Sequence, residues 1–424
     1  MIPVLLISMI VLAVIGMPLA FAMGIAATLG IAAHDFLPFA LVPQRIMNAL
    51  DKFPFLAVPM FVLAGELMNT SGITDRIIRF CVALVGHVRG GLAQVNVLAS
   101  IFFAGISGSA TADAAGLGKL LIPAMIKEGF DDDYSVAVTA ASSTVGPIIP
   151  PSGMLIIYAS MTNLSIGKLF LAGVFPGLLL GFSVMVLAYI YAVKRNYPRE
   201  PWQGLVEMWR AFKSAIFALF APFIIVFGIV SGVFTATETG TVVVFYALAL
   251  GFAYGELNAR KIYRALQNAL ESTVVILFII ASASILGWLL AMGKFPIMLV
   301  DLLNAVTSDV NLMIFLIVIT LLILGLVMDG MAILVILVPV LSPVALAIGL
   351  DPIHFAILMV VSVMLGGITP PVGILLYISC QVSNVPLSRT TPMIWGFVFV
   401  MLVAVLMVAY FPPLATWLPD VLFD

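Results

Sequence analysis

A run of small and polar residues interrupts an otherwise apolar chain at positions 105–116, which read GISGSATADAAG. Within this run the hydroxyls of Ser107, Ser109 and Thr111 precede the carboxylate of Asp113. Hydroxyl and carboxylate oxygens, together with backbone carbonyls freed where a helix is broken, suit a small hard cation such as Na⁺. Glycines beside them let a solute approach the backbone closely. The segment therefore predicts a binding site for small solutes, because an ionisable residue within a membrane indicates a function by default.

A second motif, built around Pro-Pro, occurs twice. SSTVGPIIPPSGMLIIY at 142–158 aligns without a gap with SVMLGGITPPVGILLYI at 362–378. The identical pairs are Ser142/Ser362, Gly146/Gly366, Ile148/Ile368, Pro150/Pro370, Pro151/Pro371, Gly153/Gly373 and Leu155/Leu375. Each Pro-Pro pair removes backbone donors and stops the preceding helix. The sequence thus predicts two broken helices whose freed carbonyl and N–H groups face protein, water or a ligand.

The first motif also has a counterpart, LGLVMDGMAILV at 324–335. Asp113 and Pro123 stand ten residues apart, as do Asp329 and Pro339. Both halves of the chain then follow one order, a hairpin with an Asp-bearing tip and a broken helix. Counting spans between the copies places the two tips on segments that enter the membrane from opposite sides. An inverted repeat with broken helices is typical of the midplane site of a secondary transporter.

Composition agrees with a membrane location. The chain has 424 residues, of which 63% are hydrophobic and 9% charged, whereas soluble domains carry about 25% charged residues. Its long apolar runs do not alternate with polar residues, which predicts an all-α polytopic protein rather than a barrel. Two cysteines and three histidines without ligand spacing predict neither a disulfide framework nor a transition-metal site. The net charge of −2 and the lack of a basic patch argue against nucleic acid as a partner.

Orientation follows from the basic residues. The apolar run at 1–33 has no basic residue before Arg45, which predicts a retained first span with an external N-terminus. The basic clusters at 194–213 and 260–264 then fall inside, in accord with the positive-inside rule. Segments that mix charges or Trp with apolar residues are expected to lie in the interface; these are 36–50, 198–213, 258–270 and 295–308.

The predicted binding residues come from the four interrupted segments. The Na⁺ ligands are expected among Ser107, Gly108, Ser109, Ser142, Ser143, Gly146, Pro147, Gly325, Asp329, Gly366 and Thr369. Substrate contacts are expected from Ser109, Thr111, Thr144, Pro150, Pro151, Pro370 and Pro371. Asp113 and Asp329 are each predicted to cap the second helix of a hairpin, with an indirect part in cation binding. Glu66 and Glu238 have no repeat partner and are expected to pack or pair.

Two other functions compete with this interpretation. Gly105-Ile106-Ser107-Gly108 has the form of the nucleophile motif of rhomboid intramembrane proteases, with His354 as the downstream candidate base. A protease gives no reason for the second copy of the hairpin. The nearer alternative is a stand-alone divalent-anion/Na⁺ symporter that uses similar hairpins without a binding protein. A channel is disfavoured because the broken helices bring no ring of like charges.

In this order and over most of the chain, GISGSATAD, STVGPIIPPSG and GGITPPVG resemble the large membrane subunit (DctM-like) of tripartite ATP-independent periplasmic (TRAP) transporters. The resemblance implies a scaffold and an elevator-type transport domain in the bacterial inner membrane. It implies import of an organic acid driven by Na⁺, with sialic acid as the first expectation and a C4-dicarboxylate as the second, and no organic cofactor. The implied partners are a small four-helix membrane subunit, expected as a separate chain, and a periplasmic substrate-binding protein.

The resemblance and the repeats divide the chain into five parts. The expected parts are scaffold helices with an arm at 1–87, a first transport half at 88–166, further scaffold helices and arms at 167–308, a second transport half at 309–388, and a C-terminal helix at 389–424.

Overall fold

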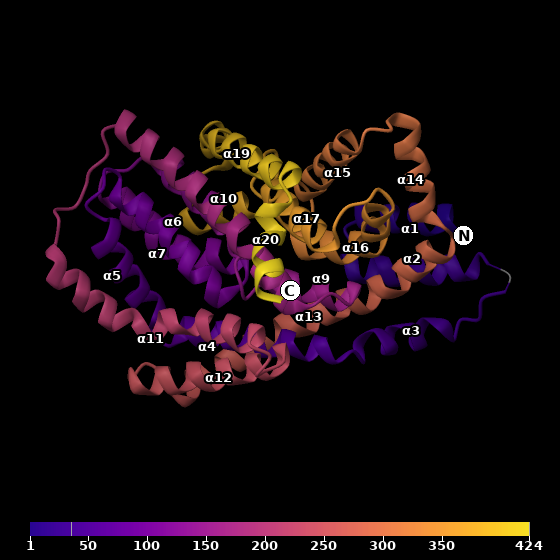
Figure 1. The fold of residues 1–424 in the computed structure, drawn as a ribbon, viewed down its shortest axis with the longest axis horizontal. Coiled ribbons are helices and arrows are strands. Elements are labelled where there is room, and N and C mark those ends of the chain that lie inside the picture. The colour runs from indigo at the N-terminus through magenta and orange to yellow at the C-terminus, as the bar shows by residue number, and fades with distance from the viewer. Residues whose placement is uncertain (35, 424) are drawn as a thin grey trace.

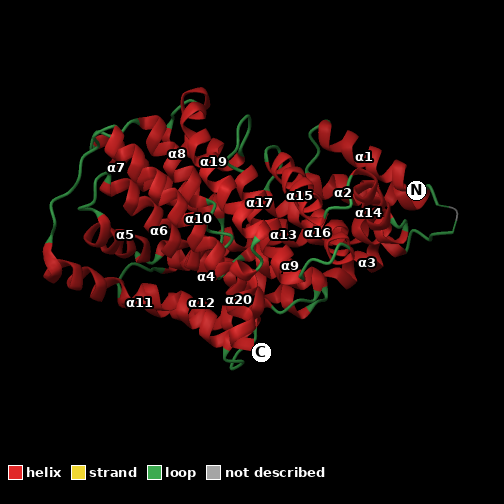
Figure 2. Cartoon of the chain, turned by 45° about the horizontal axis from the view of Figure 1, so that its top comes forward, coloured by secondary structure: helices red, strands yellow, loops and turns green. Residues whose placement is uncertain are grey.

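The computed structural model describes residues 1–34 and 36–423, and every regular element in that part of the chain is a helix (Figures 1 and 2). The helices long and apolar enough to cross a membrane are η1–α4 (Phe53–Thr70), α10 (Ile166–Lys194), α11 (Gly204–Val230), α12 (Ala236–Ala253), α13 (Ala259–Met292), α16 (Gly330–Ala347) and α19 (Leu387–Tyr410). Length and composition therefore bear out an all-α polytopic membrane protein.

The apolar N-terminal run is not one span. It forms two short helices, α1 (Ile2–Val14) and α2 (Leu19–Ala32), which pack against each other. Gly16, at φ +90°, and Pro18 separate them. At 1.5 Å per residue each helix is about 20 Å long, short of the roughly 30 Å hydrocarbon core. The expected single first span was wrong, and the external N-terminus that depended on it stays a prediction.

The four segments expected to lie in the interface fall into two groups. α3 (Leu41–Leu50), without a buried residue, and α14 (Phe295–Val306) are separate short helices. By contrast, the charged segments 204–213 and 259–270 are the first turns of α11 and α13 and continue into their apolar parts. No helix-breaking pair follows those first turns, so separate interface helices at 198–213 and 258–270 were a wrong prediction.

Both repeats fold as the sequence predicts. The first hairpin is α6 (Gly91–Ser107) and α7 (Ala110–Lys127), and the second is α15 (Val310–Gly325) and α16. The broken helices are α8 (Asp132–Ser143) with α9 (Gly153–Thr162), and α17 (Pro352–Gly366) with α18 (Ile374–Ser383). At about 15–23 Å, none of these four half-helices spans the hydrocarbon core alone. The long helices α10 and α19 follow the two broken helices.

The two repeats interlock in one central unit, here called the hairpin body and comprising α6–α9 and α15–α18. α9 of the first repeat packs on α16 of the second, while α18 of the second packs on α7 and α8 of the first. Around this body lie the outer helices, of which α13 contacts α2, α3, α4 and α16 (Figure 1). Further outer pairs include α4 with α12 and α5 (Ile73–Val85) with α11, and α20 (Pro413–Phe423) packs on α10.

A charge cluster ties helices of both repeats together at one end of the hairpin body. Arg195, at the end of α10, contacts Asp131 at 2.8 Å, and Arg389 of α19 contacts Asp132 at 2.9 Å. The Tyr197 hydroxyl donates a 2.6 Å hydrogen bond to Asp131. Burial and this hydrogen bond raise the pKa of Tyr197 to about 12, so the phenol remains a donor at neutral pH. The cluster therefore joins the start of α8 to α10 and α19.

Candidate solute-binding site

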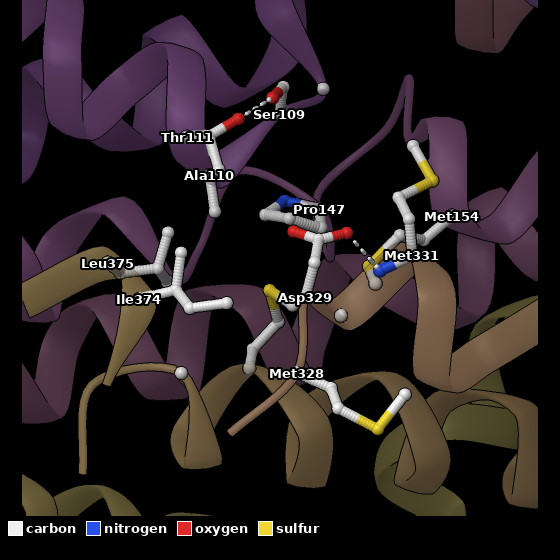
Figure 3. Close-up of a pocket in the computed structure, with 14 residues that line it drawn as sticks. Ser109, Ala110, Thr111, Pro147, Met154, Met328, Asp329, Met331, Ile374 and Leu375 are labelled. Atoms are coloured by element: carbon white, nitrogen blue, oxygen red, sulfur yellow. Dashed lines mark hydrogen bonds between the residues drawn. The ribbon is translucent and has the colours of Figure 1, made fainter. Parts of the chain in front are cut away.

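The two hairpin tips are built by different capping chemistry. In the first, Gly108 ends α6 in the left-handed region at φ +59°, and the Ser109 hydroxyl accepts a hydrogen bond from the N–H of Ala112. In the second, the Asp329 carboxylate accepts the N–H of Met331 at 3.0 Å, capping α16 as predicted. Figure 3 shows Ser109 and Thr111 on one tip and Met328 and Asp329 on the other, approaching from opposite sides of Pro147.

Asp113 does not cap α7, in contrast to the prediction. The cap is Ser109, and Asp113 lies in the first turn of the helix, four residues further on. Ser109 takes the role because its backbone is extended where the chain leaves Gly108. The Asp113 carboxylate instead turns back to the tip, where its Oδ1 accepts a hydrogen bond from the Ser107 hydroxyl. Its free side then faces the first broken helix.

The second oxygen of Asp113 is the least satisfied polar atom of the site. Asp113 is 1% exposed, and its Oδ2 has no hydrogen-bond partner among the described residues. This oxygen faces Gly146 closely enough that a Cβ built on Gly146 would lie 2.7 Å from it. A buried carboxylate is costly unless a cation or hydrogen-bond donors compensate it. A side chain at position 146 would therefore press against that oxygen.

A small cavity of about 50 Å³ lies where the four interrupted segments meet. It is lined by Gly108, Ser109 and Thr111 of the first tip and Met328, Asp329 and Gly330 of the second. Pro147 of the first loop and Gly367 of the second also line it, together with the apolar side chains of Ala110, Met154, Met331, Met364, Ile374 and Leu375. Since a single water needs about 10–15 Å³ on this measure, the cavity has room for an ion or a few waters, and not for an organic acid.

A larger cleft of about 320 Å³ opens on the other side of the first tip. Ser107, Ser109 and Thr111 line it from the hairpin body, with Pro151 of the first loop. The facing wall belongs to the outer helices α4 and α13. Its volume is at the lower end of the roughly 300–1,000 Å³ of small-molecule pockets. The first tip therefore separates an ion-sized space from one large enough for a small organic molecule.

The other predicted residues line neither space. Ser143, Thr144 and Thr369 donate their hydroxyls to carbonyls one turn back, at 2.7–2.8 Å, and Ser142 accepts from Ser100 at 2.9 Å. Gly325 and Gly366 pack backbone against backbone where α15 crosses α17. Thr144, Pro150, Pro370 and Pro371 were expected to contact substrate, but the structure does not bring them to the cleft; Thr144 is fully buried. Both Pro-Pro bonds are cis.

The residues that form the outer wall of the cleft were not among the predicted site residues. Glu66 and Asn69 of α4 and Ser272 of α13 face the first tip, whereas Glu66 was expected to serve packing or pairing. Part of that expectation holds, because Glu66 accepts a 3.2 Å hydrogen bond from the Asn268 side chain. Glu238 is paired locally, in the capping box of α12 with Thr235. A charged residue within the apolar run 57–70 was the available signal for Glu66.

The protease interpretation fails on geometry. The Ser107 hydroxyl donates to Asp113, and the ring nitrogen Nε2 of His354 lies 2.7 Å from the carbonyl oxygen of Val408. The proposed nucleophile and base therefore have different partners.

Comparison with known proteins assigns this chain to a protein family. The DctM component family of tripartite ATP-independent periplasmic transporters matches residues 6–414. The sialic acid TRAP transporter large permease protein SiaM of Vibrio cholerae is 38% identical over 96% of this chain and 95% of its own length. The 2,3-diketo-L-gulonate permease YiaN of Escherichia coli is 36% identical over 94% of each chain. The C4-dicarboxylate permease DctM of V. cholerae is 35% identical over 96% of this chain and 95% of its own length.

Solved structures share the fold at low sequence identity. The YdaH transporter of Alcanivorax borkumensis aligns with a TM-score of 0.57 at 14% identity, covering 83% of this chain and 84% of its own. MtrF of Neisseria gonorrhoeae aligns with a TM-score of 0.57 at 13% identity, covering 87% and 82%. The family match extends over nearly the whole chain and disfavours both the protease and the stand-alone symporter. The protein belongs to the DctM family, the large permease subunits of TRAP transporters.

Proposed function

We propose that this permease imports an organic acid together with Na⁺ across the bacterial inner membrane. It receives the acid from a periplasmic binding protein and works with a small four-helix membrane subunit. The observation that carries the proposal is the buried Asp113 carboxylate, with one oxygen unpartnered in front of Gly146. Coupling-ion and substrate sites lie together in secondary transporters, and Ser107, which bonds to Asp113, also lines the larger cleft.

The residues around Asp113 fit Na⁺. Its Oδ2 supplies negative charge, and Ser107 Oγ supplies a neutral oxygen. These are hard oxygen donors, the class that such cations select. Sodium binding would compensate the buried carboxylate and hold the tip against the first loop. The second tip offers Asp329 and backbone groups instead of hydroxyls, so a second cation site would differ from the first.

The cleft beside the tip is the proposed place for the acid. The N-terminal end of α7 points N–H groups and a positive macrodipole at the tip, and Ser109 and Thr111 add hydroxyls. Among similar permeases, those named for sialic acid, diketogulonate and C4-dicarboxylates are of nearly equal identity. Sialic acid is the first proposed substrate and a C4-dicarboxylate the second.

An elevator motion accounts for access from both sides. The cleft has one wall on the hairpin body and the other on α4 and α13. Gly65 of α4 lies against the first tip, where an added Cβ would stand 3.4 Å from the carbonyl oxygen of Ile106. Because Gly65 has no side chain to interlock with the tip, this contact suits sliding of the hairpin body along fixed outer helices.

Uptake into proteoliposomes tests the proposed function. The permease and its small subunit are reconstituted, and labelled sialic acid or succinate is supplied with the cognate binding protein. We expect uptake under an inward Na⁺ gradient with the binding protein present, and background uptake when either is withheld. Equal uptake with K⁺ replacing Na⁺ would refute Na⁺ coupling.

A further inference from the structure

We propose that the outer wall of the larger cleft, formed by Glu66, Asn69 and Ser272, selects polyhydroxylated monocarboxylates over dicarboxylates. The inference rests on the proposed function and specifies its substrate class. It concerns residues outside the hairpins and the repeated loops. The inference is based on the side chains of this wall, which include a carboxylate but neither Lys nor Arg.

The wall changes character along α4. Val58, Phe61, Val62, Gly65, Glu66 and Asn69 line the cleft, at the spacing of a single helix face. The first three are apolar and the last two are polar, so one end of the cleft suits carbon atoms and the other hydrogen-bonding groups. On α13 the lining residues Ser272 and Ile276 again pair a hydroxyl with an apolar side chain. This amphipathic wall matches a substrate with both apolar and hydroxyl-bearing parts.

Glu66 has hydrogen-bonding capacity left over. Its Oε2 accepts the 3.2 Å bond from Asn268, and no bond to its Oε1 occurs within the described residues. Asn69 is half-buried, and its side-chain amide likewise has no partner in the part of the chain that the structure describes. These groups can accept hydroxyl hydrogens and donate to hydroxyl oxygens. Contact of Gly65 with the backbone of Ile106 and Ser107 keeps this end of the wall next to the tip.

Charge decides between the two classes of acid. One carboxylate can bind at the tip, beside the positive end of α7 and the hydroxyls of Ser109 and Thr111. A second carboxylate on the same substrate would face Glu66, and neither Lys nor Arg occurs among the residues that line the cleft. Like charges in a site of reduced dielectric repel, whereas hydroxyl groups donate charge-assisted hydrogen bonds to a carboxylate. The wall therefore favours hydroxyl groups and disfavours a second anion.

Direct binding to the purified complex of the permease with its small subunit tests the inference without a binding protein. Affinities for N-acetylneuraminate, gluconate and succinate are measured by isothermal titration calorimetry in Na⁺ buffer. Glu66→Gln keeps the shape of the side chain and its bond to Asn268 while removing the charge. Glu271→Gln is the matched control, because Glu271 is exposed on α13 and does not line the cleft.

We expect wild type to bind a polyhydroxylated acid more tightly than succinate. Glu66→Gln should weaken that binding about tenfold, the scale of one charge-assisted hydrogen bond, and leave succinate binding no weaker. Glu271→Gln should bind all three acids as wild type does. Tighter binding of succinate by wild type, or equal losses for all acids in Glu66→Gln, would overturn the inference and leave the proposed function standing. Failure of wild type to bind any of the three acids in Na⁺ would also overturn the inference, whereas background uptake with Na⁺ and the binding protein both present would refute the proposed function itself.

Discussion

Replacing Gly146 with alanine places a methyl group in front of the unpartnered oxygen of Asp113. The new Cβ would lie 2.7 Å from Asp113 Oδ2 and 3.3 Å from the carbonyl carbon of Ser109, whereas ordinary contacts begin at 3.4 Å. The carboxylate must therefore withdraw by about 0.7 Å, and its other oxygen is held by Ser107. Misplacement of a binding group by about 1 Å can cost about a hundredfold in function. We expect the Na⁺ concentration for half-maximal uptake to rise at least about tenfold.

The assay is Na⁺ titration of uptake in proteoliposomes, with thermal unfolding of the same preparation as a folding control. Overpacking costs about 1–3 kcal/mol, so the variant should still fold, with a lower Tm. Gly116→Ala is the matched control on α7, since no atom lies within 4 Å of its added Cβ. It should retain wild-type Na⁺ dependence. A folded Gly146→Ala variant with wild-type Na⁺ dependence would refute the assignment of this space to the cation.

Three further substitutions test other parts of the account. Asp113→Asn removes the buried charge and should raise the Tm in Na⁺-free buffer, while the stabilisation by Na⁺, about 2.7 kcal/mol in wild type at 100 times Kd, should vanish; an unchanged Na⁺-dependent rise in Tm would count against the site. Gly366→Ala would place a Cβ 2.7 Å from the Cα of Gly325 and from the carbonyl oxygen of Leu322, so it should destabilise the complex by about 2–3 kcal/mol. Gly118→Ala is the control, because its added Cβ meets only ordinary contacts, so this variant should keep the wild-type Tm. Equal losses of Tm in the two variants would contradict the close packing of α15 on α17. Asp329→Ala should cost about 1 kcal/mol through loss of the cap, whereas Asp329→Asn should retain it; equal losses would show that capping is not its role.

Repetition made the hairpin body predictable. The paired Asp and Pro-Pro motifs located both tips and both loops, because a helix interrupted by Pro-Pro and Gly inside a membrane has few other structures available. The N-terminal run and the first turns of α11 and α13 were mispredicted. Hydropathy does not distinguish one long span from two short helices, or an interface helix from the charged end of a long one. Tertiary contacts decide these cases.

The site was predictable as a location but not in detail. Sequence placed Asp113 near the first tip, but the cap depends on which residue leaves the turn in an extended conformation, and that residue is Ser109. The proximity of Gly146 to Asp113 follows from packing of α7 on α8, across 33 positions of the chain. Glu66 and Ser272 lie outside the two segments whose repetition was recognised, so no internal comparison pointed to them.

Binding of radioactive ²²Na⁺ to the purified complex reports directly on the proposed cation site at Asp113. We expect saturable binding in wild type and in Gly116→Ala, loss of that binding in Asp113→Asn, and binding at least about tenfold weaker in Gly146→Ala. Wild-type ²²Na⁺ binding in a folded Asp113→Asn variant would contradict that assignment.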